Sequence, residues 1–421
     1  MKIFSFFKRI QIGKISCLFF IVLVASCAKE NAIPESDTNL HFFSLSTGEK
    51  VFKSISLKNG NFAMVGEVQG DAFISINTAK GEVIAYSKFG GNLKDAFYDI
   101  IETQNGNLIA VGAIKSASLG AQSEVTSDGY LVVFNSNTEV ITKKIIGSEY
   151  DLEEINCVLE NPAGGYILGG MRYTGAMKSY VVSLDANYDI KWEHYYNVGP
   201  YHNFTKAICF SPSGDIVIGG LCSNQNNAVN SRKFDTYLVV LGQLDGKVIK
   251  GRVYTDYTRA DQFSNSFIAG SPLFLFAEQT GYRWFTFIEG SNYTGQCQII
   301  NLDLDFNIIK EKRIHGLNVH LPHQVIKTED EGYLICGQSS AESLGPFGFS
   351  NASSSLIKLD KSGIEEWQSN CGSDQSISAC LGAVYKEEQW QVLSSIYNPN
   401  NALLNFAMYT VDNKGKIVNT K

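Results

Sequence analysis

Short apolar runs alternate with polar turns along most of this chain, and the alternation repeats. The clearest unit is a turn followed by an apolar run that ends in glycine, as in NGNLIAVG at 105–112. Related runs recur roughly 45 to 60 residues apart, a period typical of propellers and solenoids. Seven copies lie at 59–66, 105–112, 164–170, 213–220, 272–277, 331–337 and 389–394.

One predicted strand precedes each run and two follow it, so each repeat holds four short strands, which we name A to D. The run itself is strand B, and the last repeat takes 416–418 as its strand D. Turns such as LDANYD and VDNKG are rich in Asp, Asn and Gly, which is hairpin chemistry. Runs such as YVVSL are apolar at consecutive positions, which indicates strands buried on both faces.

This pattern predicts an all-β chain, a seven-bladed β-propeller of four-stranded antiparallel blades over residues 45–421. A solenoid is the alternative fold. It would need a steady coil length and caps, whereas uneven loops favour the propeller. Around Trp192 and Trp367 the repeat D-x-Y-L-V-x-L-D-x-x-G-x-x-x-W resembles secreted bacterial propellers of the quinoprotein-like branch, which includes outer-membrane assembly lipoproteins. Quinone enzymes of that branch carry adjacent cysteines, which this chain lacks, so we expect no cofactor.

The N-terminus has the pattern of a signal peptide. Basic residues including Lys8 and Arg9 precede an apolar run at 15–24, which is too short for a comfortable membrane span. Val24-Ala25-Ser26-Cys27 then resembles the bacterial lipobox. This resemblance implies cleavage before Cys27, acylation of Cys27 and attachment to the outer membrane, on its periplasmic or its outer side. We therefore predict a signal peptide at 1–26, a lipidated N-terminus and tether at 27–44, and a membrane partner through the lipid anchor.

Composition limits the other partners. The formal charge is −7, which argues against nucleic acid because phosphate binding needs a basic face. Seven cysteines follow Cys27, so they cannot all pair, and only Cys371 and Cys380 flank one loop in a way that allows a disulfide. No CxxC occurs, so a zinc ribbon lacks support.

The B–C and D–A connections are long and uneven, and in a propeller they share one face. Variable loops on a rigid scaffold are where binding usually occurs. We expect a protein partner or a glycan there, because aromatic faces beside Ser and Asn groups suit such ligands. The alternative is that these aromatics pack the loops onto the blades. The candidate ligand-binding residues are Tyr201, His202, Tyr282, Trp284, Tyr293, His320, His323 and Phe347.

Two other sets of residues, a group of histidines and the recurring aspartates, do not indicate a metal site. His315, His320 and His323 have no nearby cysteine and match no ligand spacing, so we predict no metal site. Aspartates recur before strand A and at the C–D turn, and repetition favours turn capping over a ring of metal ligands. They are Asp95, Asp151, Asp261 and Asp374, and Asp185, Asp303, Asp360 and Asp412.

No catalytic motif occurs in a credible context, so we assign no catalytic residue and expect a non-enzymatic binding lipoprotein. A hydrolase or lyase acting on polysaccharide at the axial mouth is one alternative, for which carboxylates and a His or Arg must converge there. An envelope-assembly scaffold is the other, and rests on the fold resemblance.

Overall fold

The computed structural model describes residues 41–43, 49–90, 93–115, 127–148, 151–223, 234–255, 273–289, 295–314, 319–340, 352–371, 377–398 and 403–418. Asn39–Lys421 forms one compact unit. Cys27 and the predicted signal peptide lie outside the described residues. Within the described part of the chain, no helix has the length and apolar character needed to cross a membrane.

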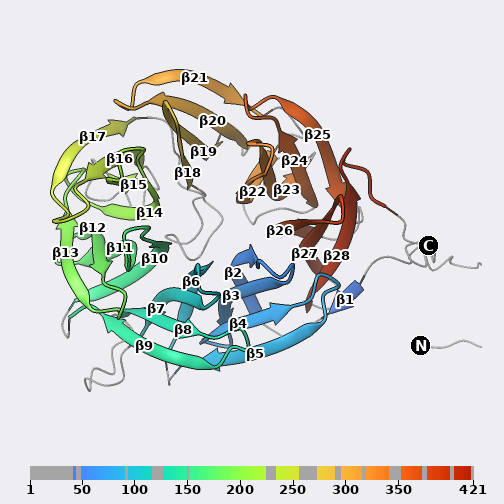
Figure 1. Ribbon diagram of the computed structural model, residues 1–421, viewed down its shortest axis with the longest axis horizontal. Helices are drawn as coiled ribbons and strands as arrows, with labels where there is room; N and C mark the ends of the chain where they lie inside the picture. Colours follow the sequence, from blue (N-terminus) through green and yellow to red (C-terminus); the bar gives the residue numbers. More distant parts are fainter. Residues whose placement is uncertain are drawn as a thin grey trace, which may run out of the picture. The chain divides into compact units, whose positions relative to one another are not determined.

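The prediction of an all-β, seven-bladed propeller is confirmed, with the blades arranged in a ring (Figure 1). Each blade is a four-stranded antiparallel sheet whose first strand is innermost. Blades 1 to 3 are β2 (Glu49–Ser56), β3 (Phe62–Val68), β4 (Asp71–Asn77) and β5 (Val83–Phe89); β6 (Ala96–Glu102), β7 (Leu108–Ile114), β8 (Asp128–Phe134) and β9 (Val140–Ile146); and β10 (Leu152–Glu160), β11 (Tyr166–Tyr173), β12 (Met177–Leu184) and β13 (Ile190–Tyr196).

The remaining blades continue around the ring. Blades 4 to 7 are β14 (Asn203–Phe210), β15 (Ile216–Cys222), β16 (Asp235–Leu241) and β17 (Val248–Tyr254); β18 (Leu273–Glu278), β19 (Gly281–Glu289), β20 (Gly295–Asp303) and β21 (Ile308–Arg313); β22 (Val319–Lys327), β23 (Tyr333–Ser340), β24 (Ser353–Leu359) and β25 (Glu365–Cys371); and β26 (Ile377–Lys386), β27 (Gln389–Asn398), β28 (Leu403–Asp412) and β1 (His41–Phe43). A parallel bridge between Gly295 and Val319 joins blades 5 and 6 into one sheet.

Both ends of the chain supply the outer edge of blade 7. Residues His41–Phe43 pair with Met408–Phe406 of β28, although they precede the predicted start of the propeller at residue 45 (Figure 1). The predicted last strand at 416–418 is reduced to a bridge between Ile417 and Val411 and a hydrogen bond from Val418 N to Thr410 O of 2.8 Å. The ring is therefore closed by β1 with a short C-terminal addition.

The core lies between neighbouring blades. The middle strands are buried on both faces, as β8 and β15 show at every position, because each blade packs against two others. A buried cluster fills each junction between consecutive blades, including the closing junction where Phe62 and Met64 meet Leu393 and Phe406. This confirms the burial predicted from consecutive apolar positions.

In five blades the repeated glycine lies opposite a β-bulge of strand A, where the strand A backbone approaches it closely. Gly112 lies opposite Phe97, where β6 has its bulge, and a Cβ at Gly112 would lie 1.9 Å from the carbonyl oxygen of Ala96. No side chain fits at that distance. The same approach occurs at Gly66, Gly170, Gly220 and Gly337. Blade 7 has a bulge at the same register but Ser394 opposite it, so serine is accommodated there.

The C–D turns confirm the capping role predicted for their aspartates. Asp185 Oδ1 accepts hydrogen bonds from Asn187 N at 2.8 Å and Asp189 N at 2.9 Å. Asp303, Asp360 and Asp412 accept the equivalent pairs. Before strand A the aspartates differ: Asp95 accepts from Lys115 N at 2.9 Å, whereas Asp151 pairs with Arg172. Asp261 and Asp374 lie outside the described residues.

Candidate functional site

Two of the predicted ligand-binding aromatics lie in the protein core. Tyr282 and Trp284 are 3% and 0% exposed and belong to β19, where the ring of Trp284 lies 5.4 Å from that of Tyr254. Blade 5 is therefore out of phase with the prediction. The run at 272–277, predicted as strand B, lies in β18, which is strand A, and residues 281–289, which would then belong to the long B–C connection, form strand β19. The prediction failed because blade 5 lacks the glycine that fixes the phase of the repeat. Side chains buried this deeply do not contact a ligand at the surface.

Tyr201 and His202 lie together between β13 and β14. Tyr201 N donates to Ser223 O at 3.2 Å, and His202 O accepts from Ser223 N at 2.8 Å. The side chain of Tyr201 is 37% exposed and that of His202 is half-buried. This corner is held by its backbone, and Tyr201 remains accessible.

His320 and His323, two of the three histidines considered as metal ligands, both belong to β22. His323 occupies the bulge of this strand, and its Nε2 lies 3.3 Å from Gln338 Oε1. Burial lowers the pKa of His323, and the hydrogen bond to Gln338 only partly offsets that effect. Only the backbone of His320 is described, and His315, Tyr293 and Phe347 lie outside the described residues. Among the described residues no group of three His, Cys, Asp or Glu side chains could hold a metal.

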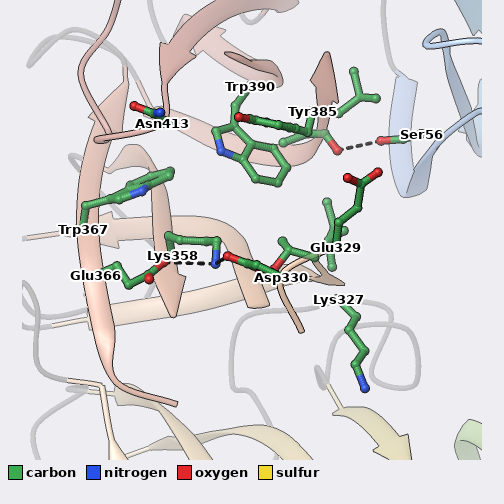
Figure 2. A pocket seen from close by; sticks show the side chains of 14 residues that line it. Ser56, Lys327, Glu329, Asp330, Lys358, Glu366, Trp367, Tyr385, Trp390 and Asn413 are labelled. Carbon is green, nitrogen blue, oxygen red and sulfur yellow. Dashed lines mark hydrogen bonds and ion pairs between the residues drawn. The ribbon is translucent and has the colours of Figure 1, made fainter. Parts of the chain in front are cut away.

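The structure instead places an open cleft between blades 6 and 7, on the face of the short A–B and C–D turns (Figure 2). Its volume is about 540 Å³, within the range of about 300–1,000 Å³ typical of small-molecule sites. The turn 327–330, the ends of β24 and β26, the starts of β25 and β27, and Asn413 line it, and Ser56 adds an edge from blade 1. We call it the blade 6–7 cleft.

Three aromatic side chains line this cleft. Trp390 is 6% exposed and its ring lies 4.8 Å from that of Tyr385, which is 44% exposed. Trp367 is half-buried and packs against Gly415, where a Cβ would lie 2.7 Å from the indole. Figure 2 shows Trp367 on the opposite side of the cleft from Glu329, with Trp390 between them. The cleft thus combines a fixed indole wall with an accessible phenol ring.

The floor of the cleft is a buried lysine held by two carboxylates. The side chain of Lys358 is 7% exposed, and its Nζ lies 2.7 Å from Asp330 Oδ2 and 3.1 Å from Glu366 Oε2 (Figure 2). Burial alone would raise the pKa of Asp330, but hydrogen bonds from Lys358 and Thr328 outweigh it and lower that pKa to about 2. Both carboxylates also reach solvent, since the side chain of Asp330 is 55% and that of Glu366 45% exposed.

At the equivalent place between blades 3 and 4, side chains form hydrogen bonds from one blade to the other. There Trp192, at the register position of Trp367, donates from Nε1 to Gln243 O at 3.4 Å. Gln243 Nε2 in turn donates to Asn161 Oδ1 at 2.9 Å, across the space between the blades. The open cleft therefore does not follow from the repeat itself.

A second charged cluster lies on the opposite face, at blade 3. Arg172 Nη2 is 2.8 Å from Asp151 Oδ2 and Arg172 Nε is 3.2 Å from Glu153 Oε1. Burial raises the pKa of Glu153 to about 7, although Ser148 N and Arg172 oppose the shift. A carboxyl group with such a pKa can serve as a general acid. The side chain of Glu153 is 0% exposed, however, so it does not contact a substrate in this conformation.

The sequence contained a weak signal for the blade 6–7 cleft. Trp367 stands at a repeated position of the sequence, whereas Trp390, Asp330 and Lys358 look like ordinary strand or turn residues and nothing in the sequence singles them out. Cys371 and Cys380, for which the sequence left a disulfide open, are buried free thiols.

No protein-family model matches this chain, and no curated protein matches it in sequence. Solved structures with a similar fold include the β-propeller domain of the Trilobed protease from Pyrococcus furiosus, at 10% identity and a TM-score of 0.47, covering 89% of this chain and 99% of that one. Another is the quinohemoprotein alcohol dehydrogenase from Comamonas testosteroni, at 10% identity and a TM-score of 0.46, covering 86% and 68%.

Proposed function

We propose that this protein is an outer-membrane lipoprotein that binds a glycan in the blade 6–7 cleft. The observation that carries the proposal is the open cleft in which Tyr385, Trp390 and Trp367 lie beside carboxylates. A sugar ring offers an apolar face that stacks on an aromatic ring and hydroxyl groups that need hydrogen-bond partners. Glu329, Asp330 and Glu366 supply acceptors, and Asn413 supplies both kinds of group.

The blade 6–7 cleft lies on the face of the A–B and C–D turns, opposite the face that the sequence predicts for binding. The long loops of the other face fall largely outside the described residues, and their candidates Tyr201 and His323 do not share a described pocket. The blade 6–7 cleft brings aromatic and polar groups of three blades together.

Glycan-array screening followed by calorimetry on the full chain tests the binding proposal. Tyr385→Ala removes an exposed ring and should weaken binding about tenfold, the equivalent of about 1.4 kcal/mol. Tyr173→Ala is the matched control, because Tyr173 is also 44% exposed but lies on blade 3. The proposal is wrong if no glycan binds, or if both variants bind a glycan like the parent while remaining folded.

The lipid anchor is tested separately. Cys27→Ala should abolish incorporation of a labelled fatty acid and move the protein from the membrane fraction to the soluble fraction. Ala28→Gly leaves the thiol intact and serves as the control. Persistent membrane attachment of Cys27→Ala would exclude acylation at this residue as the anchor.

A further inference from the structure

The buried lysine of the blade 6–7 cleft has no donor left for a bound molecule. Lys358 Nζ lies 2.7 Å from Asp330 Oδ2 and 3.1 Å from Glu366 Oε2. It also donates to the carbonyl oxygen of Leu359 at 3.0 Å. An ammonium group has three hydrogen atoms to donate, and these three acceptors use all of them. Lys358 therefore holds the cleft together and is not available to pair with an acidic ligand.

The second lysine of the lining is turned to a neighbouring blade. Lys327 Nζ donates to Glu278 Oε2 of blade 5 at 3.4 Å. Figure 2 shows the side chain of Lys327 pointing away from Trp390 and Tyr385. The described lining therefore presents no free positive charge to a ligand in the cleft.

Negative charge predominates in the cleft. Its lining has three carboxylates, those of Glu329, Asp330 and Glu366, against Lys358 as the one lysine that faces it. At neutral pH this leaves an excess of two negative charges. Figure 2 shows Glu366 and Glu329 on opposite sides, with Lys358 and Asp330 between them. A ligand that spans the cleft thus meets carboxylates at both ends.

The aromatic wall favours the same kind of ligand. The rings of Tyr385 and Trp390 have centroids 4.8 Å apart and an interplanar angle of 50°, and Trp367 lies across from Glu329 (Figure 2). The electron-rich face of an indole or a phenol attracts a cation and also stacks on an apolar ring face. Carboxylates and aromatic faces are therefore both complementary to a ligand that joins positive charge to a sugar ring.

We propose that the glycan bound in the blade 6–7 cleft is an oligomer of amino sugars whose free amino groups are positively charged. This inference rests on the proposed glycan binding and names its ligand class. The sugar rings lie against Trp390 and Tyr385, and the ammonium groups lie against Glu329 and Glu366. An acidic glycan would set like charges against each other with no lysine free to receive it, and an N-acetylated glycan would leave the carboxylates unpaired.

Three tetrasaccharides with the same β-1,4-linked backbone test the proposal by calorimetric titration of the full chain at pH 5.5. The tetramer of glucosamine is cationic at this pH, and the tetramers of N-acetylglucosamine and of glucose are neutral. Exposed carboxylates are still ionised. The glucosamine tetramer should bind about tenfold more tightly than either neutral tetramer, and added salt should reduce that difference.

The outcomes separate this proposal from the glycan binding on which it rests. If the glucosamine and glucose tetramers bind equally, the cleft binds glycans without selecting amino sugars, and the proposal is wrong. If the glucosamine tetramer does not bind, the proposal is also wrong, and the glycan array alone decides whether another glycan binds. Binding of trilysine as tightly as the glucosamine tetramer would show that charge suffices without a sugar ring, which equally contradicts the proposal.

A matched pair of variants locates the charge. Glu329→Gln should weaken binding of the glucosamine tetramer about threefold, with a smaller effect on the glucose tetramer because the amide oxygen still accepts hydrogen bonds. Glu331→Gln is the control, because Glu331 is exposed in the same turn but does not line the cleft. Both side chains are exposed, so both variants should fold. Equal weakening by the two variants, or none by Glu329→Gln, would contradict the placement of the ammonium groups.

Discussion

Glu153→Gln should remove a pH dependence from the stability of the propeller. In the folded protein, burial raises the pKa of Glu153 to about 7 from its ordinary value of 4.5, despite Arg172 Nε at 3.2 Å. Its Oε2 is buried without a hydrogen bond, so the ionised form is poorly compensated. The folded state therefore binds this proton more tightly than the unfolded state does.

The direction and the size of this pH dependence follow from the linkage between proton binding and folding. Between pH 4.5 and 7 the folded protein holds the proton that the unfolded chain has lost, so the free energy of unfolding falls as pH rises through this window. The difference between the two pKa values corresponds to about 3 kcal/mol. Glutamine has nearly the same shape and does not titrate, so the variant lacks this decline.

Urea unfolding of both proteins at pH 4.5, 6 and 8 measures the effect. From the lowest to the highest pH, the free energy of unfolding of the parent should fall by about 3 kcal/mol relative to Glu153→Gln. Other titrating groups are common to both proteins and cancel in the difference. Parallel profiles, or a relative gain for the parent at high pH, would show that Arg172 keeps Glu153 ionised and refute the reasoning.

Three further predictions concern the scaffold. Gly112→Ala should destabilise the propeller by about 2–3 kcal/mol in urea unfolding, because its Cβ meets the Ala96 carbonyl, whereas Ser394→Ala at the matching position of blade 7 should change little. A chain beginning at residue 45 should unfold roughly 2–4 °C below one beginning at residue 40, because it lacks β1; equal midpoints would contradict closure by β1. Lys358→Met should return the pKa of Asp330 from about 2 toward 3.8 in an NMR titration, and an unchanged value would rule out Lys358 as its main partner.

The features of the fold that repeat from blade to blade are predictable from the sequence. The consecutive apolar positions of strands B and C predict burial on both faces, and the turn aspartates predict their own backbone hydrogen bonds. Both depend on residues close in sequence. The strands of blade 5 are predicted one position out of phase, because the strand that contains Trp284 lacks the glycine that marks strand B in other blades. That strand is nevertheless as buried as the others.

The blade 6–7 cleft could not be predicted in the same way. Its wall takes Trp390 from blade 7 and Trp367 from blade 6, which pack as neighbours, and closure of the ring adds Ser56 from blade 1. At the related place between blades 3 and 4, Gln243 Nε2 donates to Asn161 Oδ1 of the neighbouring blade. A local sequence pattern carries no information on such contacts between blades.

The outer edge of blade 7 also orders the events of folding. His41 pairs with Met408, so the first strand of the ring must wait for a partner synthesised at the far end of the chain. Contacts of such long sequence separation form late, because the intervening chain has to be organised first. Until then β28 presents an unpaired edge to its surroundings. A second chain can offer the same three-residue strand to that edge, which makes strand exchange between crowded neighbours the natural misassembly of this propeller.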